Sequence, residues 1–246
     1  MIRALAFAIA VMLSTTPSAA ADAGFTPAQR AEIVSIVRDA MKADPSILRD
    51  AVVSLQADEA HVQEAAARIA VARATPVLTA TAADPVEGAA NGDVTMVQFY
   101  DVRCPYCRRM LPTVAALLAA DPLLRLVDKD IPILGPPSVL GARALLAAQR
   151  QAGYVRLRDR LMSGTPDITI DVVHAAANDG GLDWARLQRD MNDPAIAERL
   201  EANVTLAHNL GIDGTPAFEI GGHVIAGAVS LSELQAAVAA ARAPHG

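Results

Sequence analysis

Apolar residues in the first part of the chain recur at helical spacing. Residues 23–76 predict two helices, each opened by a capping residue and a proline, at Thr26-Pro27 and at Asp44-Pro45. In the second helix, expected to end near residue 74, an apolar residue recurs every seven positions: Leu48, Leu55, Val62 and Ile69. A stripe with this period lets two helices bury a shared seam. Residues 23–76 are therefore interpreted as a helical segment, which could self-associate or dock on the rest of the chain.

From residue 77 the pattern changes to short apolar runs alternating with helical stretches. Residues 75–93 read as a connector with room for one edge strand. The later elements are expected as strands at 94–100 and 124–134 around a helix at 105–119, a helical stretch over about 138–210, strands at 217–220 and 223–226 joined by Gly221-Gly222, and a closing helix from Ser230. This order predicts one α/β domain, residues 77–246, with a mixed sheet and a helical insertion.

The first 22 residues have the layout of a secretory signal peptide. Arg3 precedes an apolar run from Ala4 to Leu13, and small residues follow as far as Ala23. The apolar run is shorter than the ~20 residues that a membrane-spanning helix requires. We therefore expect cleavage at residues 20–23 and export to the periplasm, an oxidising compartment.

The charge balance bears on the choice of partners. The 246 residues include 27 acidic and 21 basic side chains, a formal charge of −6, and the basic residues form no cluster. An acidic surface gains nothing from releasing the counterions of a phosphate backbone. Nucleic acid is therefore excluded as an expected partner.

The chain has only two cysteines, in the sequence Cys104-Pro105-Tyr106-Cys107. They follow the strand expected at 94–100 and open the next helix. A sulfur at a helix N-terminus faces unpaired N–H groups and the positive end of the helix dipole, which lower the pKa of a thiol. Cys104 is therefore expected to be the exposed nucleophile, and Cys107 the shielded thiol that resolves a mixed disulfide. Flanking arginines add positive potential, at positions 103, 108 and 109.

Other interpretations of the two cysteines are weaker, and one of them, a Cu(I) site, is still possible. A structural disulfide would close a very small ring, which constrains the unfolded chain little. Half of a zinc site would need two further ligands, and there is no second cysteine pair. Cu(I) held by the sulfurs of Cys104 and Cys107 stays open. Otherwise no metal and no cofactor beyond a redox-active disulfide is expected.

Two segments resemble the DsbA-like branch of thioredoxin-fold proteins. They are residues 99–107, around the cysteines, and residues 211–227, and with the helical insertion the resemblance covers about residues 83–242. It implies a thioredoxin-like fold in which the peptide bond between Thr215 and Pro216 is cis and faces the dithiol. It also implies that the backbone of Thr215 binds an extended substrate strand beside Pro216. Local sequence alone would make Pro216 an ordinary turn residue.

The Cys-Pro-Tyr-Cys box, Thr215 and the N-terminal helices are most similar to the suppressor-of-copper-sensitivity (ScsC-type) and Com1-like periplasmic proteins. In that group such helices are linked to oligomerisation and to disulfide-isomerase activity. The chain departs from the wider family at Gln98, where an acidic residue commonly accepts a proton. Asp101 is expected to be a structural or capping carboxylate, so the proton of Cys107 would move to water or to another carboxylate.

The residue between the cysteines bears on the direction of electron flow. Tyr106 stands where the strongest oxidases carry histidine, so a less depressed pKa of Cys104 and a milder oxidant are expected. The sequence thus favours an exported disulfide isomerase or reductase, with Cys104 and Cys107 as the catalytic pair and Pro105 and Tyr106 in support. It would act on periplasmic protein thiols and disulfides, and a membrane electron donor would keep it reduced. A dithiol oxidase served by a quinone-linked membrane partner, and a Cu(I)-binding or holdase protein, are the alternatives.

Overall fold

The computed structural model describes residues 25–79, 84–164 and 167–243, so the expected signal peptide, residues 1–22, lies outside the described residues. The chain divides into two compact units at residue 58. The described part of the first unit consists of α1 (Pro27–Ala43) and the start of α2 (Ser46–Thr79). Thr26 caps α1 and exchanges hydrogen bonds with Gln29 in a capping box. None of residues 25–58 is buried, so this unit has no core of its own.

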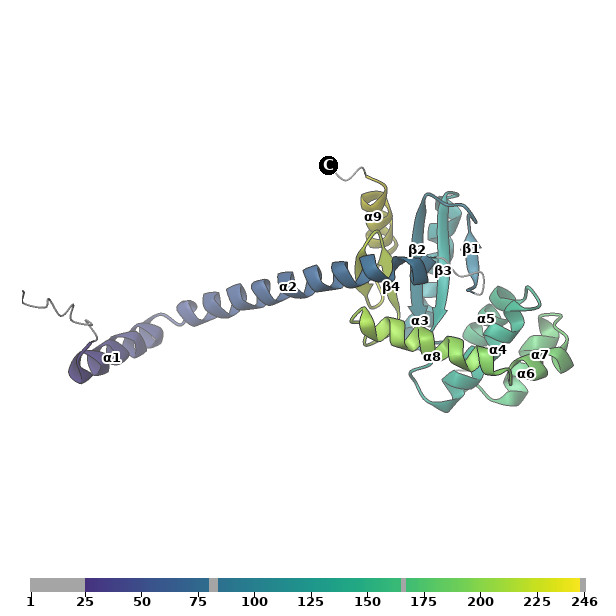
Figure 1. Ribbon diagram of the computed structural model, residues 1–246, viewed down its shortest axis with the longest axis horizontal. Coiled ribbons are helices and arrows are strands. Elements are labelled where there is room, and N and C mark those ends of the chain that lie inside the picture. The colour runs from purple at the N-terminus through teal and green to yellow at the C-terminus, as the bar shows by residue number, and fades with distance from the viewer. Residues whose placement is uncertain (1–24, 80–83, 165–166, 244–246) are drawn as a thin grey trace, which may run out of the picture. The chain divides into compact units, whose positions relative to one another are not determined.

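The second unit is built on a five-stranded mixed sheet in the order β1-β3-β2-β4-β5 (Figure 1). The two central strands are parallel and all other neighbouring strands are antiparallel. The strands are β1 (Val86–Gly88), β2 (Val94–Tyr100), β3 (Leu124–Asp130), β4 (Ala217–Ile220) and β5 (His223–Ala226). The fold class predicted from the sequence, α/β with a mixed sheet, is confirmed.

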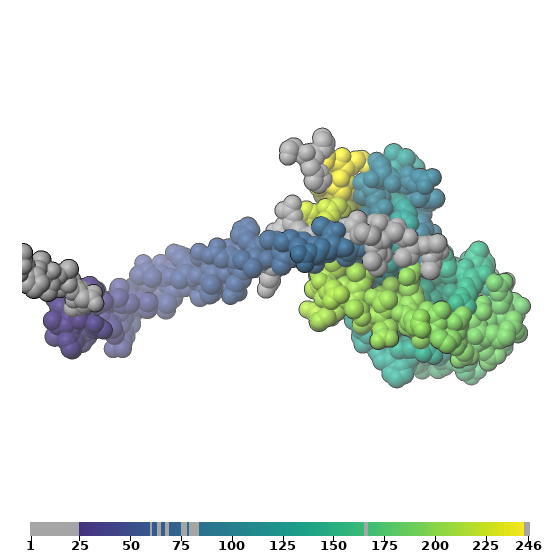
Figure 2. Space-filling model, in the orientation of Figure 1, coloured from purple at the N-terminus to yellow at the C-terminus, as the bar shows by residue number. Residues whose placement is uncertain are grey.

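Helices cover both faces of this sheet. The helices after α2 are α3 (Pro105–Ala120), α4 (Pro136–Gln149), α5 (Tyr154–Ser163), α6 (Ile170–Asp179), α7 (Trp184–Asp190), α8 (Pro194–Asn209) and α9 (Leu231–Arg242). One face packs against α3 and α9 through a cluster that includes Met96, Leu124 and Phe218. The opposite face packs against α8 and the end of α2, which lie beside each other in Figure 2.

Two element boundaries differ from the sequence-based expectation. The α2 helix continues to Thr79 instead of ending near residue 74, because Val71 and Leu78 are buried in the core against the sheet. The β3 strand ends at Asp130 instead of residue 134. Proline lacks the N–H that a sheet ladder requires, so Pro132 prevents further pairing.

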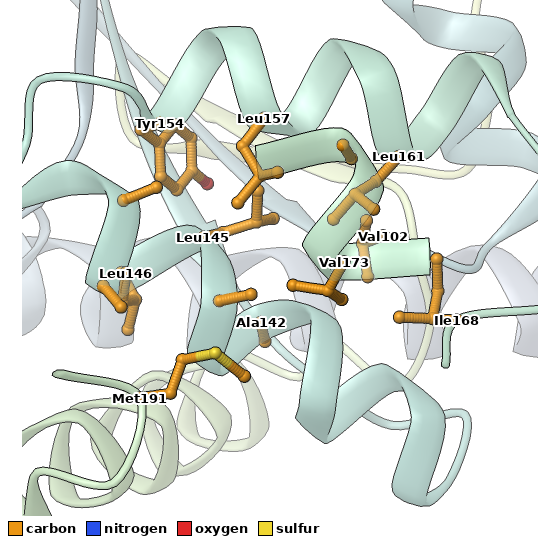
Figure 3. Close-up of a cluster of buried hydrophobic side chains, with 14 of the residues drawn as sticks. Val102, Ala142, Leu145, Leu146, Tyr154, Leu157, Leu161, Ile168, Val173 and Met191 are labelled. Atoms are coloured by element: carbon orange, nitrogen blue, oxygen red, sulfur yellow. The ribbon is translucent and has the colours of Figure 1, made fainter. Parts of the chain in front are cut away.

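The helical insertion forms a core next to the dithiol. Its helices, α4 to α7, gather at one end of the unit (Figure 1), and their apolar side chains point toward one another around Leu145 and Leu157 (Figure 3). Helix α4 approaches the loop before Cys104 very closely, because a Cβ atom placed on Gly141 would lie 2.6 Å from a methyl group of Val102. Helix α4 of the insertion therefore packs directly against the loop that precedes Cys104.

Candidate active site

The two cysteines lie at the N-terminus of α3, where the sequence predicts them. Cys104 is the N-cap residue, Pro105 is the first helical residue, and Cys107 lies in the first turn. Both cysteines are free thiols. The thiol of Cys104 donates a hydrogen bond to the backbone carbonyl of Thr215, with 3.2 Å between sulfur and oxygen. The peptide bond between Thr215 and Pro216 is cis. The fold thus brings together two segments that are more than a hundred residues apart.

Cys104 is less exposed than the sequence predicts. Its exposed fraction is 4%, and that of Cys107 is 0%. The expectation of an exposed nucleophile is wrong in this structure, because the carbonyl of Thr215 lies against the sulfur of Cys104. Tyr106, between the two cysteines, is the exposed member of the box at 53%.

The environment of the dithiol pushes the two thiol pKa values apart. The pKa of Cys104 is lowered to about 5, mainly by a hydrogen bond from Cys107, against the opposing effect of burial. A hydrogen bond with the side chain of Thr215 and the backbone N–H groups of Cys107 and Tyr106 lower it further. The hydrogen bond to Cys104, followed by burial, raises the pKa of Cys107 far above its usual range. One thiol is therefore a thiolate at neutral pH and the other keeps its proton.

The flanking arginines are engaged with neighbouring groups. Arg103 donates to the carbonyl of Leu134 at 2.8 Å, and Arg108 donates to the carbonyls at the end of α5, at residues 162 and 164. The guanidinium of Arg109 stacks over the ring of Tyr106 at 4.2 Å. The largest contributions to the lowered pKa of Cys104 are thus hydrogen bonds at the helix start, and not the arginine charges that the sequence suggested.

Asp101 fastens the loop that precedes the dithiol. Its buried carboxylate accepts hydrogen bonds from the N–H of Arg103 at 2.8 Å, the N–H of Leu134 at 3.1 Å and the hydroxyl of Ser138 at 2.8 Å. The carbonyl of Asp101 accepts the N–H of Cys104 at 3.0 Å. These contacts join the start of α3 to the loop between β3 and α4, so Asp101 is a structural carboxylate that positions Cys104.

Sequence reasoning missed a group of buried charged side chains at the end of β3. Arg158 of α5 forms ion pairs with Glu87 of β1 and, at 3.2 Å, with Asp128 of β3. The hydroxyl of Tyr154 donates to Asp130 at 2.8 Å, and burial raises the pKa of Asp130 to about 7. A signal was present, because charged residues occupy three consecutive positions, 128–130, in the strand expected at 124–134.

The family comparison follows from this geometry. The family described as DSBA-like thioredoxin domain matches residues 95–239, which contain the dithiol, the helical insertion and the Thr215-Pro216 turn. This chain belongs to the DsbA-like thioredoxin family. The prediction of that family from the sequence is confirmed. The DsbA-like domain is a thiol–disulfide oxidoreductase domain, and its dithiol consists of Cys104 and Cys107.

A second family match and the solved structures extend the similarity to the N-terminal helices. The family described as copper resistance protein ScsC N-terminal domain matches residues 29–61. Proteus mirabilis ScsC in a transitional conformation is 29% identical with a TM-score of 0.66, over 89% of this chain and 99% of that one. This DsbA-like protein is thus similar to ScsC in both of its parts.

Two further structures match about two thirds of the chain. A thioredoxin-like oxidoreductase from Silicibacter pomeroyi DSS-3 is 41% identical with a TM-score of 0.66, over 68% of this chain and 96% of that one. A periplasmic thioredoxin-like protein from Salmonella enterica serovar Typhimurium is 30% identical with a TM-score of 0.63, over 68% of this chain and 95% of that one.

Curated relatives are much longer proteins. The chain is 29% identical over 160 residues to the Na(+)/H(+) antiporter NhaA 3 of Salinispora tropica, and this match spans 64% of the chain and 24% of the antiporter. The chain thus spans about a quarter of the length of this curated relative. Antiporter activity belongs to that longer protein. Within residues 25–79, 84–164 and 167–243, no helix is both long and apolar enough to cross a membrane.

Proposed function

We propose that this chain is an exported disulfide isomerase or reductase that acts on periplasmic proteins through Cys104 and Cys107. The observation that carries the proposal is the free dithiol at the N-terminus of α3, where the sulfur of Cys104 lies 3.2 Å from the carbonyl oxygen of Thr215 and the pKa of Cys104 is lowered to about 5. Thiols of this motif range from about 3.5 in a strong oxidase to about 7 in thioredoxin, and a low pKa makes a thiol leave easily but attack weakly. An intermediate value suits a protein that must both attack and release substrate disulfides, as shuffling requires.

The N-terminal helices support an oligomeric isomerase. The apolar stripe of α2 is exposed, with 49% exposure at Leu48, 58% at Leu55, 70% at Val62 and 54% at Ile69. Isolated helices without a packed face are marginal in water, and residues 25–58 have no buried residue. A second copy of the same stripe is the partner that a seven-residue repeat fits. An oligomer would hold several dithiols around one misfolded substrate.

The substrates would bind beside the dithiol as extended segments. The carbonyl of Thr215 already faces the sulfur of Cys104, so a strand that pairs with this residue would lie against the reactive thiol. We propose Thr215 and Pro216 as the substrate-binding residues, and a membrane electron donor as the partner that restores the dithiol after each reduction.

The experiment that tests the proposal is to trap the thiols in intact cells and to read the redox state of the protein on a gel. The expected result is a mainly reduced dithiol, together with recovery of activity from a scrambled multi-disulfide substrate by the purified protein. A mainly oxidised dithiol, with rapid oxidation of reduced peptides and no unscrambling, would reverse the proposed electron flow and make the protein a dithiol oxidase.

A further inference from the structure

The chemistry of the dithiol requires a proton acceptor near Cys107. This thiol must lose its proton before it can attack the mixed disulfide on Cys104, yet it is 0% exposed and its pKa is raised. Gln98, on the strand that leads to the dithiol, is buried and cannot ionise. Asp101 is already committed to three hydrogen-bond donors in the loop. The base must therefore lie elsewhere.

The strand register places a buried carboxyl group next to Gln98. In the parallel pairing of β2 with β3, Gln98 is the partner of Asp128, so the two side chains leave the same face of the sheet. The Asp128 side chain is 0% exposed. One of its oxygens is bound by Arg158 at 3.2 Å, and the other has no hydrogen-bond partner within the described part of the chain. Burying a carboxyl group with only one of its two oxygens hydrogen-bonded costs folding free energy, which suggests that the group has a function.

A groove lies between Arg158, which binds this carboxyl group, and α3, the helix that carries Cys107. Its walls include Gln98, Glu87 and Arg158 on one side and the α3 residues Leu111 and Val114 on the other. Leu111 lies one turn after Cys107 on the same face of α3, and it packs against the apolar cluster that contains both cysteines. The groove thus begins one turn from Cys107 and passes two neighbours of Asp128, its strand partner Gln98 and its ion-pair partner Arg158.

We propose that Asp128, held by the same Arg158 that binds Glu87, exchanges the proton of Cys107 through solvent in this groove. This inference rests on dithiol exchange at Cys104 and Cys107 and is independent of its direction. The carboxyl group of Asp128 lies on β3, at the register partner of Gln98 on β2.

The proposed step balances in both directions. A proton passes from the sulfur of Cys107 to the carboxylate of Asp128, and the thiolate attacks the sulfur of Cys104. The bond between Cys104 and the substrate sulfur breaks, the substrate leaves as a thiolate, and the dithiol is oxidised to a disulfide while the substrate is reduced. In the reverse direction a substrate thiolate attacks Cys104, and Cys107 leaves as a thiolate and takes the proton back.

Other ionisable groups surround Asp128. Burial raises the pKa of Asp128 well above its usual range; Arg158 opposes this shift, while Glu87 and Asp130 add to it. Tyr100 and Tyr154 bond to each other on the same face of the sheet, and Tyr154 also donates to Asp130. Lys129 is paired with Asp84. Burial and the like charges of Glu87 and Asp130 thus raise the affinity of Asp128 for a proton, and Arg158 limits this effect.

The test follows the reaction of the reduced protein with 5,5′-dithiobis(2-nitrobenzoate) by stopped flow. The first thiolate released reports attack by Cys104, and the second reports attack by Cys107 on the mixed disulfide. Asp128→Asn is expected to slow the second phase by about tenfold or more near neutral pH and to leave the first phase unchanged. The deficit should shrink as the pH rises, because hydroxide can then deprotonate Cys107 directly.

Matched variants separate proton exchange from a structural role. Asp159→Asn removes another carboxylate that binds Arg158 at 3.0 Å but is 56% exposed, and it should leave both phases unchanged. Adding Gln98→Glu to Asp128→Asn returns a carboxyl group to the same face and should restore the second phase. If Asp128→Asn does not fold, Glu87→Gln serves instead, with a smaller slowing of the second phase expected.

Each outcome has a distinct meaning. An unchanged second phase in folded Asp128→Asn, or a double variant that stays slow, would overturn the proton-exchange proposal. Absence of the first phase in the unmodified protein would instead overturn the proposed function, because Cys104 would then not be a nucleophile.

Discussion

The two units of this chain differ in how their apolar residues are used. In residues 25–58 every apolar side chain is at least partly exposed, including Ile36 at 61% and Leu55 at 58%. In the second unit the central strands are buried almost completely, and even Asp128 and Asp130 lie inside. Only the second unit can be stable from its own contacts. The first unit exposes the apolar residues that the proposed self-association would bury.

The largest effect should come from charges placed on the exposed stripe of α2. Leu48→Glu with Leu55→Glu is expected to convert an oligomer to monomers, because each buried leucine contributes about 1.5–3 kcal/mol and each glutamate would need desolvation. Sedimentation velocity measures the change, and unscrambling activity should fall with it while simple reduction of a peptide disulfide persists.

The matched control for this variant is Gln56→Glu, which adds a charge at an exposed position of α2 outside the stripe. It should leave the oligomer intact. Sedimentation of the unmodified protein as a monomer would contradict the interpretation of the stripe as a shared seam.

A second prediction compares one buried leucine with one exposed leucine. Leu145, in the core of the helical insertion, is 0% exposed, and Leu145→Ala is expected to lower the free energy of unfolding by about 2–5 kcal/mol. Leu55→Ala should leave the unfolding of the second unit unchanged. The fluorescence of Trp184, the single tryptophan of the chain, measures this in urea because it lies in α7 of that unit. Equal losses for both variants would mean that the units unfold together.

The sequence predicts those features that depend on local pattern. Helical spacing locates α1 and α2, the Gly221-Gly222 pair locates the turn between β4 and β5, and the box of two cysteines opens α3. The seven-residue stripe is also visible directly in the sequence. These features follow from residues that are close together along the chain.

The remaining features depend on contacts between distant segments. The burial of Cys104 results from the carbonyl of Thr215, and the proximity of Asp128 to Gln98 results from the register of two parallel strands. Neither contact has a local signature. The later end of α2 has the same origin, since Val71 and Leu78 pack against the sheet.

A third prediction concerns pH, and it tests whether the second unit alone controls the dithiol. The ultraviolet absorbance of the thiolate should titrate with a midpoint near pH 5, because the pKa of Cys104 is lowered to about 5. The thiolate is therefore present above this pH and is lost as the pH falls through it. Cys107→Ala removes the hydrogen bond that is the largest cause of the shift, so its midpoint should move upward.

The Leu48→Glu and Leu55→Glu substitutions should not change this midpoint, because the groups that lower the pKa of Cys104 lie in the second unit. A midpoint that moves with the oligomeric state would show that the N-terminal helices reach the dithiol.

The smallest expected effect on stability comes from removing a helix cap, and it can be compared at two capping boxes of the same geometry, at the starts of α1 and α9. Thr26 accepts the N–H of Gln29 at 3.3 Å at the start of α1, and Ser230 accepts the N–H of Glu233 at 3.2 Å at the start of α9. Ser230→Ala is expected to destabilise the second unit by about 1 kcal/mol, because α9 buries Leu234 in the core against the sheet. Thr26→Ala should leave the urea midpoint of Trp184 fluorescence unchanged and lower only the helical circular dichroism of the monomeric variant. The same hydrogen bond thus contributes to global stability only where its helix is packed, and a shift of the Trp184 midpoint by Thr26→Ala would contradict the division at residue 58.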